Sequence, residues 1–331
     1  MGYPGKPEMD EREAAQKLAR EFGIPHHTVE LSEGEVVRDF PDLVNESDDL
    51  LADIAAPGYR ALAKASHELG APVLLMGQGG DELFWGYRWV RESAQPLGIV
   101  DGSAPEDEIR EIPWTQQILA LWEAGRFFPY CRSEEVARAL KVLPWMGGRF
   151  NSHKLRRQAA RVWDHPELPA GLRVTGLIAR SYLLANGLPL ADRLGMAHSV
   201  EARQLFLDHR LWETVLGHRQ KSPDFFLPPK AWLKNWARLH LPSWWLERPK
   251  RGFTPPAQKW KRAVTAKYAS LLERGWWEES GLVSRNWIQK VVKLAPRKAR
   301  YADMAYKLLV GEMWMRTIRQ SANRSSPLGA T

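Results

Sequence analysis

Residues 77–82 (GQGGDE) have the side chains and spacing expected of a site for an anionic or nucleotide ligand. Glycines let the backbone approach a ligand closely, and a helix beginning at Asp81 would add the positive end of its dipole. Asp81 could hold Mg²⁺ against phosphate groups, because hard cations prefer carboxylate oxygens. The same pattern also fits a tight turn in which Asp81 is only an N-cap, and the glycines alone do not decide between the two.

The neighbouring residues predict that this segment follows a parallel strand. Residues 73–76 (VLLM) are an unbroken apolar run, typical of a strand buried on both faces. A helix predicted over 57–70 precedes the run, and residues 81–84 begin another. A strand, a glycine loop and a helix in this order place a ligand at the carboxyl end of the strand in a doubly wound sheet.

Other elements follow from hydrophobic periodicity and capping signals. We predict a helix over 10–22, a strand over 26–31, and a helix capped by Ser32 that runs toward Val44, since Glu35 completes the capping-box spacing. Beyond residue 101 the patterns predict helices and no further strand. These helices are expected at 115–123, 134–142, 172–184, 211–216, 257–272 and 301–318.

The chain is expected to divide into an α/β nucleotide-binding part at residues 1–100, a mainly helical part at 101–320 and a frayed tail at 321–331. Its 331 residues are 44% hydrophobic and 26% charged, which excludes global disorder. No apolar run is long enough for a membrane helix, and the single Cys131 excludes internal disulfides. We therefore expect a cytoplasmic protein.

The formal net charge of +8 fits an anionic small molecule as well as a polyanion. The basic segments at 154–161, 248–251 and 297–300 are short, and the spacing in the first and last favours solvated helix faces. Nucleic-acid binding is therefore a minor alternative, and no membrane partner is expected.

Three longer segments resemble the synthetase domain of the asparagine synthetase family. They are residues 73–87 (VLLMGQGGDELFWGY), 192–211 (DRLGMAHSVEARQLFLDHRL) and 241–260 (LPSWWLERPKRGFTPPAQKW), and residues 48–59 resemble the acidic segment of the family. The segments occur in the family's order and extend over nearly the whole chain. The resemblance implies an ATP-pyrophosphatase fold, similar to the adenine nucleotide α-hydrolases, with a partial doubly wound parallel sheet followed by helices.

The implied reaction is ATP-dependent amide formation. A carboxylate, either aspartate or a sugar or peptide carboxylate, becomes an acyl-adenylate, and ammonia then attacks the acyl carbon; ATP and Mg²⁺ are the implied cofactors. By resemblance, Lys250 and Gln78 are catalytic residues, and Asp81 binds the metal. The implied nucleotide-binding residues are Met76, Gly77, Gln78, Gly79 and Asp81, and the implied substrate-binding residues are Glu82, Arg193, Glu201, Arg203 and Asp208. Buried structural ion pairs are an equal alternative for this last set.

The sequence departs from the family pattern in three respects. No S-G-G-x-D-S pyrophosphate loop is present, so we expect a truncated or split form of the synthetase. No glutaminase domain is present, so a separate glutaminase or pyrophosphate-loop polypeptide is a possible partner. Gln78 stands where well-studied members have Glu, and its amide cannot accept a proton at neutral pH. The alternative is a catalytically inactive remnant, or a subunit that needs a partner chain.

Overall fold

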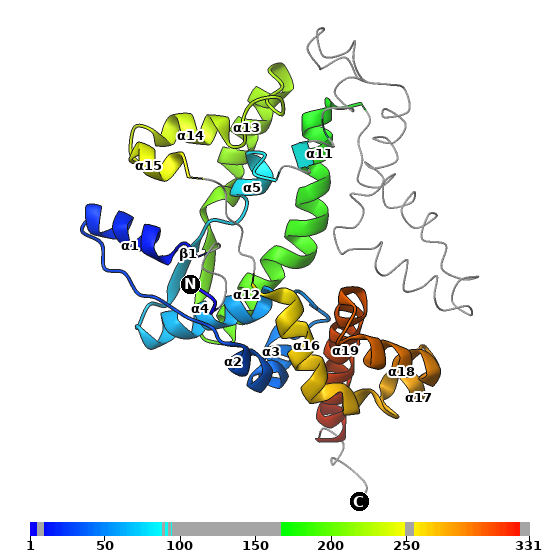
Figure 1. Ribbon diagram of the computed structural model, residues 1–331. Helices are drawn as coiled ribbons and strands as arrows, with labels where there is room; N and C mark the ends of the chain where they lie inside the picture. The colour runs from blue at the N-terminus through cyan, green and yellow to red at the C-terminus, as the bar shows by residue number, and fades with distance from the viewer. Residues whose placement is uncertain (5–9, 88–89, 92–93, 95–166, 249–254, 325–331) are drawn as a thin grey trace, which may run out of the picture. The chain divides into compact units, whose positions relative to one another are not determined.

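The computed structural model describes residues 1–4, 10–87, 90–91, 94, 167–248 and 255–324 (Figure 1). The chain forms two compact units. The first unit comprises Met1–Leu74, Leu190–Glu201 and Pro249–Thr331, and the second comprises Leu75–Pro189 and Ala202–Arg248. Each unit therefore combines segments that are far apart in the sequence. The predicted boundary near residue 100 lies outside the described residues, as do the helices predicted over 115–123 and 134–142.

Helices make up most of the first unit, and the capping box at its second helix is confirmed. The Ser32 hydroxyl accepts a hydrogen bond from the Glu35 N–H (3.3 Å), and the Glu35 carboxylate accepts one from the Ser32 N–H (2.8 Å). The helices of the first unit are α1 (Arg12–Glu21), α2 (Glu33–Arg38), α3 (Phe40–Ser47), α4 (Ala56–Glu68), most of α12 (Leu188–Met196), α16 (Ala257–Tyr268), η4 (Ala269–Leu272), α17 (Trp276–Glu279), α18 (Arg285–Leu294) and α19 (Ala299–Arg324).

The single helix predicted from Ser32 toward Val44 is wrong, because α2 ends at Arg38 and α3 begins at Phe40. Pro41 has no N–H and cannot donate to the carbonyl of Val37, one turn earlier. The hydroxyl of Tyr268 donates to that carbonyl instead, at 2.8 Å. A side chain from α16 thus satisfies the backbone group that proline leaves open.

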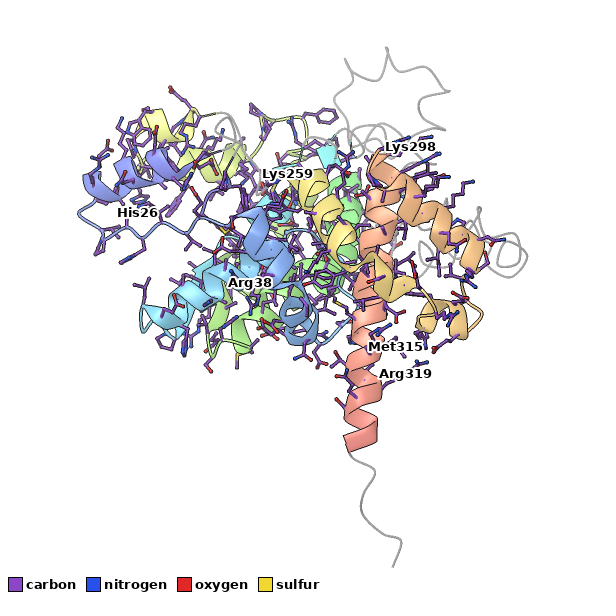
Figure 2. The ribbon with its side chains drawn as sticks, turned by 60° about the horizontal axis from the view of Figure 1, so that its bottom comes forward. His26, Arg38, Lys259, Lys298, Met315 and Arg319 are labelled. Carbon is purple, nitrogen blue, oxygen red and sulfur yellow. The ribbon has the colours of Figure 1, made fainter. Side chains whose placement is uncertain are left out.

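Helix α19 packs against α3, α16 and α18 within the first unit (Figure 1). Lys261 of α16 and Asp303 of α19 form a buried ion pair, 2.5 Å between Nζ and Oδ1. Met315 and Arg319 lie further along α19 (Figure 2), where Arg319 pairs with Glu279 of α17. None of the helices that the structure describes combines the length and apolar composition needed to cross a bilayer.

The second unit has its own buried core of Trp85, Val174, Ile178 and Phe225 with smaller side chains around them. The helix predicted over 172–184 is confirmed in its first half, whereas its second half is a π-helix. The helical elements are α5 (Gly80–Leu83), α11 (Ala170–Ile178), the π-helix η2 (Ala179–Gly187), η3 (Leu205–Leu207), α13 (His209–Lys221), α14 (Ala231–Ala237) and α15 (Ser243–Leu246).

Two short strands, β1 (Val73–Met76) and β2 (Glu201–Gln204), pair in a small parallel sheet. β1 is where the apolar run predicted it. The expectation of no strand beyond residue 101 is wrong, because β2 (EARQ) lacks the apolar pattern that marks a strand. The strand expected over 26–31 is represented by a single parallel bridge between Gly2 and Glu30.

The burial expected for β1 is also not found, since the side chain of Leu75 is 60% exposed. The sheet that the structure describes has two strands, and β1 pairs in it with β2. An α/β architecture with a small parallel sheet is therefore established, and the doubly wound sheet stays a prediction.

Candidate functional site

The glycine segment forms the strand, loop and helix that its residues predict. β1 ends at Met76, residues 77–79 form a turn, and α5 begins at Gly80. The Glu82 carboxylate accepts a hydrogen bond from the Gly79 N–H at 3.0 Å, which closes the turn onto the first turn of α5. The loop is thus held by a residue of the helix that follows it.

The glycines of this loop meet different surroundings. Gly79 has φ +91°, and a Cβ atom there would lie 2.9 Å from Cγ of Leu207 and 3.1 Å from the carbonyl oxygen of Phe206. A Cβ on Gly80 would lie 3.2 Å from the ring of Phe206. A Cβ on Gly77 would have no atom of the described residues within 4 Å. The close approach of Phe206 and Leu207 therefore explains why residue 79 is a glycine. The backbone at Gly77 remains open to a ligand.

Glu82 is 3% exposed, and both of its carboxylate oxygens accept hydrogen bonds. One oxygen accepts from the Gly79 N–H, and the other accepts from the Tyr87 hydroxyl at 2.9 Å.

Burial raises the pKa of Glu82 above its ordinary value, while these two hydrogen bonds favour the ionised form. This geometry suits a residue that positions the loop, and the predicted contact of Glu82 with a substrate stays a prediction.

The Gln78 side chain connects the loop to the π-helix. Its amide nitrogen donates to the carbonyl oxygen of Gly187, the last residue of η2, at 2.9 Å. A carboxylate at this position would face an acceptor rather than make this bond. The amide of Gln78 therefore acts as a donor here, and it cannot serve as a base.

Asp81 forms an ion pair that the sequence did not suggest. Its Oδ1 lies 2.7 Å from Nζ of Lys230, with 28% of the Asp81 side chain and 29% of the Lys230 side chain exposed. The N–H of Lys230 donates to the carbonyl of Phe84 at 2.9 Å. Lys230 follows two prolines and precedes a short helix, a context in which a lysine has no signal of function.

A buried ion pair fixes the end of α5. Arg219 donates to Asp224 at 2.6 Å, and their side chains are 0% and 5% exposed. The same guanidinium donates to the carbonyl of Leu83 (2.6 Å) and to the hydroxyl of Thr175 (2.8 Å). The indole N–H of Trp85 also donates to Asp224, at 2.8 Å. These bonds satisfy a charge pair that would otherwise be costly to bury.

The remaining predicted residues are distributed over both units. Asp208 caps α13 and accepts from the N–H groups of Arg210 and Leu211; the Arg210 guanidinium lowers the pKa of Asp208 to about 2. Arg203 and Glu201 are exposed on β2. The first unit contains Arg193 and Glu201, and Lys250 lies outside the described residues. The other predicted site residues belong to the second unit: Met76, Gly77, Gln78, Gly79, Asp81, Glu82, Arg203 and Asp208.

Arg193 binds the chain itself. Its guanidinium donates to the carbonyl oxygens of Ser47 (3.2 Å) and Asp48 (2.9 Å), and it pairs with Asp49 at 2.8 Å. These contacts satisfy carbonyls at the end of α3, where Asp48 takes a left-handed conformation. A structural role is thus evident for Arg193, and its predicted role in substrate binding stays a prediction.

Comparison with known protein families decides the relationship. The family model for asparagine synthase matches residues 1–316. The chain belongs to the asparagine synthase family. Among curated relatives, amidase chry2 of Gibberella zeae is 28% identical over 262 residues (70% of this chain, 38% of the relative), and amidase chyE of Penicillium rubens is 29% identical over 242 residues (62% and 34%). Asparagine synthetase [glutamine-hydrolyzing] 1 of Bacillus subtilis is 25% identical over 267 residues (76% and 41%). The chain spans well under half the length of these asparagine synthase relatives.

Alanine at Gly79 should destabilise the second unit, whereas alanine at Gly77 should not. Gly79→Ala forces a Cβ into Leu207 at a left-handed φ, and we expect the free energy of unfolding to fall by about 1–3 kcal/mol. Gly77→Ala meets open space and should change it by less than about 0.5 kcal/mol. Urea denaturation of both variants measures this, and an equal loss in the two would contradict the packing argument.

Removal of the Tyr87 hydroxyl should raise the pKa of Glu82 further, because that hydroxyl donates to the ionised carboxylate. The pKa of Glu82 is higher in the folded protein than in the unfolded chain, so the free energy of unfolding falls as pH rises from the unfolded-state pKa to the folded-state pKa. Because Tyr87→Phe raises the folded-state pKa, this fall should extend to higher pH. Carboxyl ¹³C NMR titration of Glu82 tests this. Tyr301→Phe, in the first unit, is the control, and an unchanged Glu82 titration in Tyr87→Phe would contradict the assignment.

Proposed function

We propose that the chain carries the adenylating and amide-forming part of a carbon–nitrogen ligase of the asparagine synthase type. The observation that supports this most directly is the turn between β1 and α5. In it the Gly77 backbone is open, while Gly79, Gln78 and Glu82 are fixed by contacts within the second unit. A preorganised backbone at the end of a strand suits a nucleotide, and the family match extends over the same residues.

In this proposal Met76, Gly77, Gln78 and Gly79 surround the nucleotide, and the donor amide of Gln78 orients it or the attacking nucleophile. Asp81 would hold Mg²⁺, which supplies compensation for the negative charge of the phosphates. Asp81 fits this role, because its carboxylate is 28% exposed and Mg²⁺ usually takes one or two carboxylates and completes its shell with phosphate oxygens and water.

Lys250 is proposed to stabilise the charge that develops on the departing pyrophosphate, since positive charge there lowers the barrier of phosphoryl chemistry. The substrate would be a small carboxylate, aspartate or a sugar or peptide carboxylate. Glu82, Arg193, Glu201, Arg203 and Asp208 stay the proposed residues for it. The carboxylate displaces pyrophosphate from the α-phosphate of ATP, and ammonia then displaces AMP from the acyl carbon to give the amide.

One relative's name supports this class of reaction. The support comes from the relative that is named a glutamine-hydrolysing asparagine synthetase, whereas the two relatives named amidases do not bear on amide formation. The 331 residues contain no S-G-G-x-D-S loop, so we propose that this loop and the ammonia source are supplied from outside them, by a glutaminase or pyrophosphate-loop polypeptide. A cytoplasmic location is proposed because the reaction consumes ATP.

ATP–pyrophosphate exchange tests the proposal. The chain, supplemented with a polypeptide that carries the S-G-G-x-D-S loop, should catalyse exchange that depends on one of the candidate carboxylates. Lys250→Ala should reduce the rate by roughly 10- to 100-fold, the loss expected for one charge-assisted contact of ~1.5–3 kcal/mol.

The matched control is Lys259→Ala, because Lys259 is an exposed lysine of α16 whose ion pair with Glu33 is at the surface. It should leave the exchange rate unchanged. Exchange that is equally fast in Lys250→Ala, or that needs no carboxylate, would contradict the proposal.

A further inference from the structure

The ion pair between Asp81 and Lys230 is constructed by the surrounding backbone rather than formed by two mobile surface side chains. Lys230 has a left-handed backbone (φ +60°), which is uncommon for a residue with a side chain. It is held there because its N–H donates to Phe84 and its carbonyl accepts from the Lys234 N–H at 2.8 Å, where α14 begins. These bonds fix the backbone of Lys230 beside Phe84, from where its side chain reaches Asp81.

Gly86 reserves the space that this pair occupies. A Cβ atom on Gly86 would lie 2.6 Å from Cγ of Asp81 and 2.7 Å from Cε of Lys230. The N–H of Gly86 also donates to the carbonyl of Asp81 at 2.8 Å. Any other residue at this position would push the carboxylate and the lysine apart, so the glycine is explained by the pair.

The ammonium group of Lys230 and a divalent cation would compete for the same carboxylate oxygen. Both bind carboxylate oxygens, and their like charges repel each other at this separation. A cation that arrives alone and binds Oδ1 displaces Lys230 and leaves its charge uncompensated. A cation that arrives with an anionic ligand brings negative charge that compensates for Lys230.

We propose that Lys230 is the built-in counter-ion of Asp81 and discriminates against free divalent cations in favour of cations bound to a polyphosphate. This inference rests on the proposed assignment of Asp81 to Mg²⁺ and adds a positioning residue to it. Before the cation binds, Lys230 keeps the Asp81 carboxylate in place beside Gly86. When a cation binds Asp81, the Nζ of Lys230 leaves the carboxylate oxygen.

Direct Mn²⁺ binding, measured by electron paramagnetic resonance of the free ion, tests the inference without any reaction. Lys230→Met should bind free Mn²⁺ roughly two- to fivefold more tightly than the wild type, the effect expected for loss of a competing ion pair whose two side chains are less than one-third exposed. With Mn²⁺–pyrophosphate as the probe, this gain should disappear. Lys230→Arg retains the charge and should bind Mn²⁺ as the wild type does.

The matched control is Lys234→Met, because Lys234 lies one turn further along α14 and has no ion pair within the part of the chain that is described. It should leave Mn²⁺ binding unchanged. Asp81→Asn should abolish the binding, and its failure to do so would contradict the proposed metal role of Asp81. If Asp81→Asn abolishes Mn²⁺ binding but Lys230→Met and Lys234→Met bind Mn²⁺ with equal affinity, the inference about Lys230 is overturned and the metal role of Asp81 is not. Should Lys230→Met not fold, Lys230→Gln serves for the same comparison.

Discussion

The buried ion pair between Arg219 and Asp224 is the constraint on which the geometry of the second unit depends. Its two charges are almost completely removed from solvent, and the pair makes further hydrogen bonds to Thr175, Leu83 and Trp85. Removing one partner of such a pair leaves an uncompensated buried charge, at a cost of about 3–5 kcal/mol. The bonds to Leu83 and Trp85 transmit this constraint to the residues on either side of the α5 terminus.

This constraint supports backbone conformations that would otherwise be unfavourable. Trp85 has φ +58°, and a bulky residue in the left-handed region costs about 1–3 kcal/mol. Its indole is held between the Asp224 carboxylate and the Arg219 guanidinium, which lies 4.5 Å from the ring centroid. The turn at Trp85 then brings Gly86 back against Asp81. This network therefore determines where the carboxylate of Asp81, the predicted metal-binding residue, lies.

The local part of this arrangement could be predicted from the sequence. The apolar run at β1, the glycine turn and the Ser32 capping box each depend on residues within a few positions of one another, and all three are confirmed. The family relationship was also apparent, because three segments matched in order. The contact of Gly79 with Leu207 was not predictable, because glycine in a turn has the same signal whether a ligand or a side chain approaches it.

The rest depends on contacts between distant segments. Lys230 and Asp81 are separated by much of the chain, and neither periodicity nor capping relates the two. Arg219 shows no sequence signal either, since it lies in the basic last turn of α13, where a cation is expected for the helix dipole. β2 was not predicted because its four residues do not alternate between apolar and polar side chains. Leu75 is exposed, although an unbroken apolar strand predicts burial.

Photochemical cross-linking of an azido derivative of ATP, mapped by mass spectrometry, tests whether the turn after β1 binds the nucleotide, because it reports the binding site even when binding is weak. We expect that the modified peptide contains residues 73–87 and that unmodified Mg²⁺–ATP suppresses the labelling. Gly77→Ala should reduce the labelling without loss of stability. Labelling that is confined to other peptides, with residues 73–87 unmodified, would contradict the account.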